Sequence, residues 1–163
     1  MKETLLTVLE NTRLADGIYR LRLAGDTSAI TAPGQFVNLK LSGFFLRRPI
    51  SVCDWENGEV TLIYKVLGHG TEAMTGMAVG TALDVLTGLG NGFDLSRSGE
   101  HPLLVGGGVG IPPLYGLARR LTAQGKRVTA VLGFNRKSEI FLAEEFRALG
   151  AEAVSYTHLR AHE

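Results

Sequence analysis

Residues 102–121 read PLLVGGGVGIPPLYGLARRL, and they decide how the second half of the chain folds. The apolar run Pro102–Val105 leads into a cluster of glycines at 106–110. From Pro112 onward, apolar side chains recur at i, i+3, i+4 and i+7, which is the period of a helix with one buried face. Two prolines fall in the first turn, where a helix loses no hydrogen bond to them. The stretch therefore predicts a strand, a glycine loop and a helix.

The residues that follow repeat this alternation of strand and helix. Arg127–Leu132 is apolar enough for a second buried strand, Ser138 can cap a second helix that stops at Gly150, and a third strand could begin at Ala151. This order is typical of a parallel α/β domain, which we expect over residues 98–154. The domain should be incomplete, because a doubly wound nucleotide-binding domain has five or six strands.

The first half of the chain alternates apolar and polar residues over short stretches. Such stretches lie at 17–23, 35–41, 50–55 and 60–66, and Asn57-Gly58 is a hairpin signal between the last two. Several strands at short spacing, with turns between them, favour an antiparallel barrel or sandwich. We therefore expect an antiparallel β-barrel domain over residues 1–97, followed by the α/β domain.

The composition restricts the class of function. The 163 residues are 45% hydrophobic and 20% charged, and the formal net charge of +1 gives no electrostatic footprint for nucleic acid or an anionic membrane. No apolar run is long enough to span a bilayer, and the N-terminus lacks the pattern of a signal peptide. We expect a cytoplasmic protein that binds neither nucleic acid nor membrane. The single cysteine, Cys53, excludes an internal disulfide and a multi-cysteine metal site within this chain.

Two short motifs in the β domain could bind phosphate. The first is RRPIS at 47–51, where an arginine fork can donate paired charged hydrogen bonds and the proline fixes the chain as it enters a strand. A solvated arginine pair beside an edge strand is the alternative, and the motif taken alone favours it. The second is GHGT at 68–71, which can open a short helix whose free N–H groups attract an anion. A glycine turn capped by Thr71 is the alternative.

The glycine loop at 106–110 is the third candidate. Its position between a strand and a helix suits a pyrophosphate, although Pro113 stands where the usual G-x-G-x-x-G pattern has its third glycine. A tight strand–helix turn is the alternative, but such a turn rarely needs so many glycines. A further motif, TGLGNGF at 87–93, leaves room either for a flat ligand or for a flexible connection between domains.

Taken in order, these motifs resemble those of one family. RPIS, a strand with YKV, GHGT, GLGNGF and GGGVGIPPL follow one another as in the ferredoxin-reductase-like superfamily, and over about residues 5–153 the chain looks like the electron-transfer subunits of NAD-dependent dihydroorotate dehydrogenases. The resemblance implies that FAD binds the barrel through Arg48, Pro49, Ile50, Ser51, Ile63, Tyr64, Lys65, Gly70 and Thr71. It implies that NAD is placed by Gly106, Gly107, Gly108, Gly110, Ile111 and Pro112.

The same resemblance implies a role for each part of the site. Arg48 would hold the FAD pyrophosphate together with Gly70 and Thr71, while Ile50 and Tyr64 would pack against or beside the flavin, and Ser51 would lie near its N5. Electrons would pass from NADH through FAD and a [2Fe–2S] cluster to a partner. That partner would be the FMN-containing catalytic subunit of dihydroorotate dehydrogenase, in a heterotetramer that serves pyrimidine biosynthesis. The protein would supply positioning, and the cofactors the redox chemistry.

The chain departs from this family in two places. A [2Fe–2S] cluster needs four thiolates, and Cys53 is the only cysteine, so the cluster ligands are absent from this chain. Residues 155–163 fit neither a strand nor a helix period, and they do not continue the family's pattern. We therefore expect a C-terminally truncated chain that ends in a non-native tail.

Two other functions remain open at this point. The chain could be an NAD(P)H:flavin or ferredoxin-reductase-like subunit of another redox complex, or an inactive fragment that binds FAD alone. The choice of NAD over NADP is also open, because the basic residues in Asn135–Lys137 could receive a 2′-phosphate.

Overall fold

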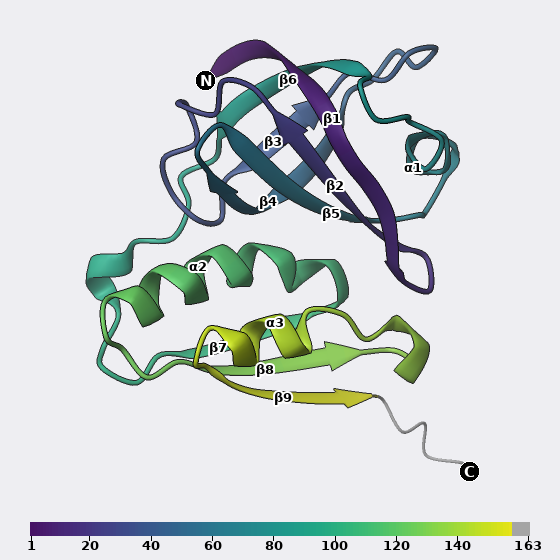
Figure 1. Ribbon diagram of the computed structural model, residues 1–163. Helices are drawn as coiled ribbons and strands as arrows, with labels where there is room; N and C mark the ends of the chain where they lie inside the picture. The colour runs from purple at the N-terminus through teal and green to yellow at the C-terminus, as the bar shows by residue number, and fades with distance from the viewer. Residues whose placement is uncertain (158–163) are drawn as a thin grey trace.

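The computed structural model describes residues 1–157, which form two units, one above the other in Figure 1. The first unit is a closed antiparallel barrel with the strand order β1-β2-β5-β4-β3-β6. Its strands are β1 (Lys2–Ala15), β2 (Ile18–Ala24), β3 (Phe36–Leu39), β4 (Arg48–Glu56), β5 (Glu59–Lys65) and β6 (Ala82–Leu89), and helix α1 (His69–Met74) lies between β5 and β6. The predicted barrel is confirmed.

The barrel is filled by apolar side chains that point inward from its strands. Leu6 and Val8 of β1, Leu21 and Leu23 of β2 and Leu62 of β5 are all fully buried. The two buried residues of β1 are two positions apart, and so are those of β2, because successive side chains of a strand point to opposite faces. The alternation in the sequence therefore reports which face of each strand points into the barrel.

The second unit is a parallel sheet in the order β7-β8-β9, with helices on one face. Its strands are β7 (Leu103–Gly107), β8 (Thr129–Phe134) and β9 (Glu152–Thr157), its helices are α2 (Pro112–Ala123) and α3 (Ala143–Ala148), and its 3₁₀ turns are η1 (Leu95–Arg97), η2 (Gly108–Gly110) and η3 (Lys137–Glu139). The predicted parallel α/β unit is confirmed, and the two prolines stand in the first turn of α2 as expected.

The second predicted helix begins later than the sequence indicates. Ser138 lies in η3, and α3 begins only after Leu142, whose φ of 66° is left-handed. The Ser138 carbonyl instead accepts a hydrogen bond from the Asp16 N–H of the barrel, at 3.0 Å. The expectation of a cap at Ser138 is therefore wrong, because contact with the barrel holds this segment outside the helix.

The predicted third strand is present as β9, and it runs further than expected. Ser155–Thr157, the first three residues of the predicted tail, pair with β8 at Leu132–Phe134. The other residues of that tail, 158–163, lie outside the described residues.

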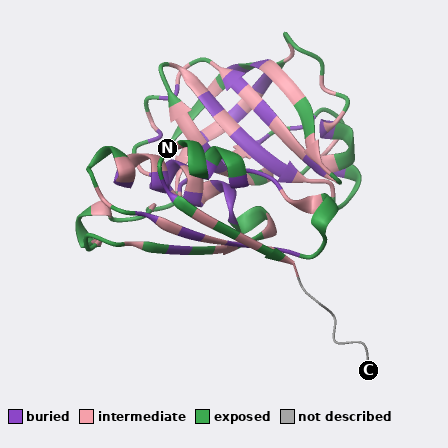
Figure 2. Ribbon diagram, turned by 60° about the horizontal axis from the view of Figure 1, so that its bottom comes forward, coloured by how far each residue is buried: buried purple, intermediate pink, exposed green. Residues whose placement is uncertain are grey.

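Only one face of the parallel sheet is covered by α2 and α3. Leu104 is buried, whereas its neighbours Leu103 and Val105 of β7 are each more than half exposed, as are Val154 and Tyr156 of β9. Successive strand residues point to opposite faces, so the exposed ones lie on the face away from the helices. Figure 2 shows the corresponding alternation of colours along the strands of this sheet. The sheet therefore presents an apolar surface on the side away from the barrel. Within residues 1–157, no helix is long and apolar enough to cross a membrane.

The two units share an apolar interface. Ile18, Cys53 and Ile63 project outward from the barrel and belong to the same buried cluster as Ile111 and Leu114 beside the glycine loop and in α2. β5 therefore buries both of its faces, one inside the barrel and one in this interface.

The buried cysteine makes stability depend on pH. Burial raises the pKa of the Cys53 thiol, so the folded state holds the proton more tightly than the unfolded chain, where a thiol ionises near pH 8.5. This contribution to stability is fully present below about pH 8.5 and is lost as the pH rises toward the folded pKa, at about 1.4 kcal/mol per pH unit. We expect the free energy of unfolding in urea to fall between about pH 8.5 and 9.5. The fall should be shallower in Cys53→Ala, and equal slopes would contradict the prediction.

Candidate functional site

The two arginines of the RRPIS motif have different surroundings. Arg47 is held on the barrel by Asp84, whose Oδ1 accepts from Arg47 Nη2 at 3.0 Å. Arg48 donates to the Leu46 carbonyl at 2.5 Å, and its guanidinium carbon lies 5.1 Å from the centroid of the Phe44 ring. No ion pair formed within residues 1–157 includes Arg48. Its charge is therefore free to bind an anion, whereas the charge of Arg47 is used within the barrel.

Arg48 lies directly against the first turn of α1. A Cβ atom placed on Gly70 would come within 2.2 Å of Arg48 Nε, so a larger residue at 70 would displace the arginine side chain. The fold thus brings the RRPIS and GHGT motifs together, although about twenty residues separate them in the sequence. The result is a guanidinium beside backbone N–H groups that have no partner within the helix, which is a donor set suited to phosphate.

Thr71 has a different position from the cap considered in the sequence analysis. The N-cap of α1 is Gly68, and Thr71 is the third residue of the helix. Its Oγ1 accepts hydrogen bonds from the backbone N–H groups of Leu67 at 2.9 Å and Gly68 at 3.1 Å. The hydroxyl therefore closes the turn that leads from β5 into α1.

The other predicted residues of β4 follow Arg48 directly along the strand. Pro49 is exposed, Ile50 is half-buried and packs against the barrel core, and Ser51 is half-buried and pairs with Phe36 of β3. A ligand held by Arg48 would meet these residues next along the strand.

The predicted residues of β5 point in opposite directions. Tyr64 is buried inside the barrel, where its ring stacks on Tyr19 and its hydroxyl donates to Asn11 Oδ1 at 2.9 Å. Burial raises the pKa of this hydroxyl. The Tyr64 side chain therefore cannot contact a ligand outside the barrel, and such a ligand could meet only the backbone of this residue. Ile63 packs in the interface between the units, and Lys65 reaches the cleft described next.

A cleft of about 480 Å³ lies between the barrel and the second unit. Gly107 and Gly108 of the glycine loop form one wall, and Lys65 and Leu67 from the end of β5 form another. Lys65 Nζ is 3.8 Å from Glu139 Oε1 of η3, so this ion pair bridges the two units beside the cleft. Because Leu67 also bonds to Thr71, the segment after β5 connects the cleft to the Arg48 group.

The remaining predicted loop residues support the cleft from behind. A Cβ atom on Gly106 would come within 2.7 Å of Leu114 Cδ1, so glycine is needed there for α2 to approach β7. Ile111 and Pro112 are buried in the core under the loop, while Gly110 is exposed. Gly108 has φ of +52°, a conformation that side chains rarely adopt, and open space lies beside it.

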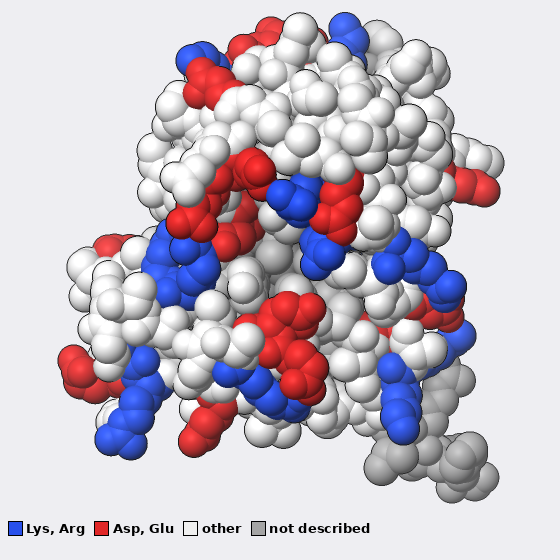
Figure 3. All heavy atoms as spheres, viewed as in Figure 1, with Lys and Arg blue, Asp and Glu red and all other residues white. Residues whose placement is uncertain are grey.

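Several lining residues of the cleft were not predicted as site residues. They share a place at or after the carboxyl ends of strands, or on the barrel surface that faces those ends: Ile18, Leu67, Val109, Gly133, Phe134, Asn135, Glu139, Phe141 and Tyr156. The rule that ligands bind beyond the carboxyl ends of parallel strands could have indicated those that follow β8. On the side of the molecule drawn in Figure 3, acidic and basic side chains are mixed on both units, and neither sign forms a large continuous region.

The chain is similar in sequence to a set of curated proteins. It is 46% identical over 158 residues to the electron transfer subunit of dihydroorotate dehydrogenase B (NAD+) from Bacillus pumilus, a match that covers 92% of this chain and 61% of the relative. It is 41% identical over 157 residues to the subunit of the same name from Fusobacterium nucleatum, with 91% and 61% covered. The chain thus spans about three fifths of the length of the curated relatives it matches. No protein-family model matches the chain.

Solved structures share its fold. The cytochrome P450 reductase GcoB of Amycolatopsis superposes with a TM-score of 0.85 at 24% identity, covering 94% of this chain and 51% of that chain. An NADH-dependent reduced ferredoxin:NADP oxidoreductase gives a TM-score of 0.82 at 29% identity, covering 93% and 56%. Phthalate dioxygenase reductase, described as a modular structure for electron transfer from pyridine nucleotides to [2Fe–2S], gives 0.80 at 20% identity, covering 95% and 51%. The barrel and the parallel unit together therefore have the ferredoxin-reductase-like fold.

Proposed function

The chain is a homologue of the electron transfer subunits of NAD-dependent dihydroorotate dehydrogenase B, of which it spans about three fifths, and on this premise we propose that it binds FAD on its barrel and NADH in the cleft beside it. FAD, when bound, takes up a hydride from NADH and can pass the two electrons on singly. The residues of this chain hold the two cofactors at a fixed distance from each other.

One observation carries the FAD assignment: Arg48 lies free of carboxylates against Gly70, at the start of α1. A guanidinium and unpaired backbone N–H groups suit a pyrophosphate. Pro49, Ile50 and Ser51 would then run along the flavin side of the site, and β5 would contribute the backbone of Ile63, Tyr64 and Lys65.

NADH would occupy the cleft, with the glycine loop 106–110 against its pyrophosphate and Ile111 and Pro112 supporting that loop from the core. We place the boundary between an FAD-binding domain and a partial NAD-binding domain at residues 97 and 98. Of the expected tail 155–163, Ser155–Thr157 belong to β9 and so to the second domain. The simplest test is to load the chain with FAD and to follow the loss of flavin absorbance when NADH is added without oxygen.

In the whole protein, the partner would be the FMN-containing catalytic subunit of dihydroorotate dehydrogenase, in a cytoplasmic heterotetramer. The [2Fe–2S] centre expected in the family would need four thiolates, and no residue of this chain is assigned to it because Cys53 is buried in the interface. Copurification of the full-length protein with the catalytic subunit would test this arrangement.

Gly108→Val should slow flavin reduction by NADH at least about tenfold, because a side chain at this position would project into the cleft and displace the nicotinamide cofactor. The FAD content should stay unchanged, since Gly108 is not part of the Arg48 group. Gly125→Val is the matched control: Gly125 has φ of +80° and open space beside it, but it does not line the cleft. Equal reduction rates in the two variants would mean that the loop is only a structural turn.

A further inference from the structure

The barrel and the second unit meet mainly where α2 lies along β4. β4 begins with the Arg48–Ser51 segment and continues to Asp54, and α2 begins just after the glycine loop and continues to Arg119 and Arg120. The two arginines stand about 11 Å further along the axis of α2 than Pro112. Each element therefore carries part of the proposed site at its start and part of the interface further on.

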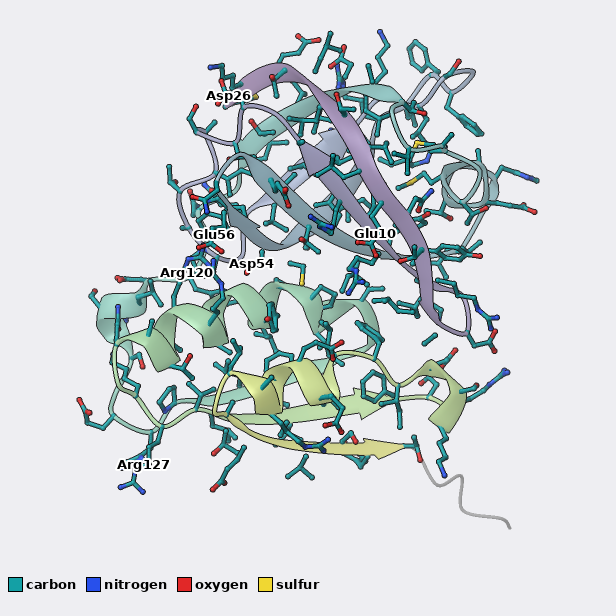
Figure 4. All side chains as sticks on the ribbon, in the orientation of Figure 1. Glu10, Asp26, Asp54, Glu56, Arg120 and Arg127 are labelled. Atoms are coloured by element: carbon teal, nitrogen blue, oxygen red, sulfur yellow. The ribbon has the colours of Figure 1, made fainter. Side chains whose placement is uncertain are left out.

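Asp54 joins the two elements with several contacts. Its Oδ1 accepts from Arg120 Nη1 at 2.9 Å and from Arg119 Nη2 at 3.1 Å, and its Oδ2 lies 2.7 Å from Arg119 Nε. The carboxylate is largely shielded, with 17% of the side chain exposed, and the hydrogen bond to it raises the pKa of Arg119. Figure 4 shows Asp54 and Arg120 facing each other across the seam between the units.

The backbone and an aromatic ring complete this contact. A Cβ atom on Gly116 would come within 2.6 Å of the Cys53 carbonyl oxygen, so α2 approaches β4 to backbone distance. The Arg120 guanidinium carbon lies 3.5 Å from the centroid of the Trp55 ring, next to Asp54 on β4. We call Asp54, Arg119, Arg120 and Trp55 the interface clamp.

An ordinary surface ion pair contributes little to stability and does not fix an orientation. The interface clamp differs in three ways. The Asp54 carboxylate contacts both Arg119 and Arg120 of α2, and the Arg120 guanidinium stacks on the Trp55 ring. In addition, Gly116 lets the backbone of α2 pack directly against that of β4. These contacts fix both the distance of α2 from β4 and its rotation.

We propose that Asp54 is a positioning residue, which sets the orientation of α2 on β4 and thereby the distance from the glycine loop to the Arg48–Ser51 segment. This inference rests on the proposed function, in which NADH and the flavin must meet across the cleft. A displacement of about 1 Å between reacting groups can cost up to a hundredfold in rate. Loss of Asp54 should therefore slow the reduction of bound FAD without weakening the binding of either cofactor.

The test compares Asp54→Asn and Asp54→Ala with wild type, each loaded with FAD and mixed with NADH. FAD content should not change, the limiting rate of flavin reduction should fall about tenfold, and the NADH concentration for half-maximal rate should change by less than about threefold. Asp54→Glu, which keeps the carboxylate, should recover part of the rate. Glu56→Gln is the matched control, because Glu56 is on the same strand, its side chain is 65% exposed, and it lies 3.8 Å from Arg119.

A second readout needs no cofactor. Trp55 is the only tryptophan of the chain, so fluorescence quenching by acrylamide in the FAD-free protein reports on the interface clamp alone. Quenching should increase in the two Asp54 variants that lose the carboxylate and stay unchanged in Glu56→Gln. Increased quenching with a normal limiting rate would overturn the proposal, because the clamp would then be only structural. A raised half-saturation concentration with a normal limiting rate would overturn it too. If wild type takes up no FAD, the proposed function itself fails, and the quenching result still shows whether the clamp forms.

Discussion

Arg48→Ala is expected to weaken FAD binding by about 1.5–3 kcal/mol, which is roughly a 10- to 150-fold rise in Kd. The reason is that Arg48 is the charged group of the RRPIS motif that stays free of carboxylates and lies against the first turn of α1. The Kd can be measured by titrating FAD fluorescence against the FAD-free protein.

Arg47→Ala serves as the control for this prediction. Arg47 is bound to Asp84 at the barrel surface, so its loss should cost about 1 kcal/mol of stability and leave the Kd for FAD unchanged. If the two variants lost FAD affinity equally, the pyrophosphate site would have to be moved away from Arg48.

Phe146→Ala should destabilise the second unit by about 3–5 kcal/mol. Phe146 of α3 is fully buried and meets the Tyr115 ring edge-on, with 5.6 Å between centroids. The interior of the barrel is a separate cluster, so the barrel should persist. Limited proteolysis of the variant should leave a resistant fragment that ends near residues 95–100.

Leu21→Ala is the converse variant, because Leu21 is fully buried inside the barrel. It should unfold the barrel and release FAD. A protected fragment covering residues 100–157 in Phe146→Ala would contradict the prediction, because the second unit would then be stable without the Phe146 ring.

The parts of the fold that the sequence could predict are those with a clean local period. The strand, glycine loop and helix around residues 103–123 are present as expected, because their signals are local. β1 gave no clear signal, since it carries register shifts near Val8 and Arg13 and pairs with two different strands along its length. The start of α3 was misplaced because a hydrogen bond to Asp16, more than a hundred residues earlier, holds Ser138 in a turn.

The site shows the same division. Arg48 and Gly70 could each be identified as candidates, but their contact depends on how the barrel closes. Alternation along β5 places Tyr64 on the same face as Val60 and Leu62, and all three are buried inside the barrel. The expectation that the Tyr64 ring lies against the flavin came from the family resemblance, and the burial of that ring does not support it. The contact of Asp54 with Arg120 joins two domains and has no signal in either motif.

The pairing of β1 determines when the barrel can be completed. Lys2–Leu6 pair only with β6, and Lys2 and Thr87 stand 85 residues apart in the chain. Bringing such distant segments together has an entropic cost, and folds rich in these contacts form slowly. During synthesis β1 leaves the ribosome well before β6, so Lys2–Leu6 have no partner strand until β6 has also emerged. The first half of β1 is therefore paired late, and until then it presents an open strand edge to which another chain could bind.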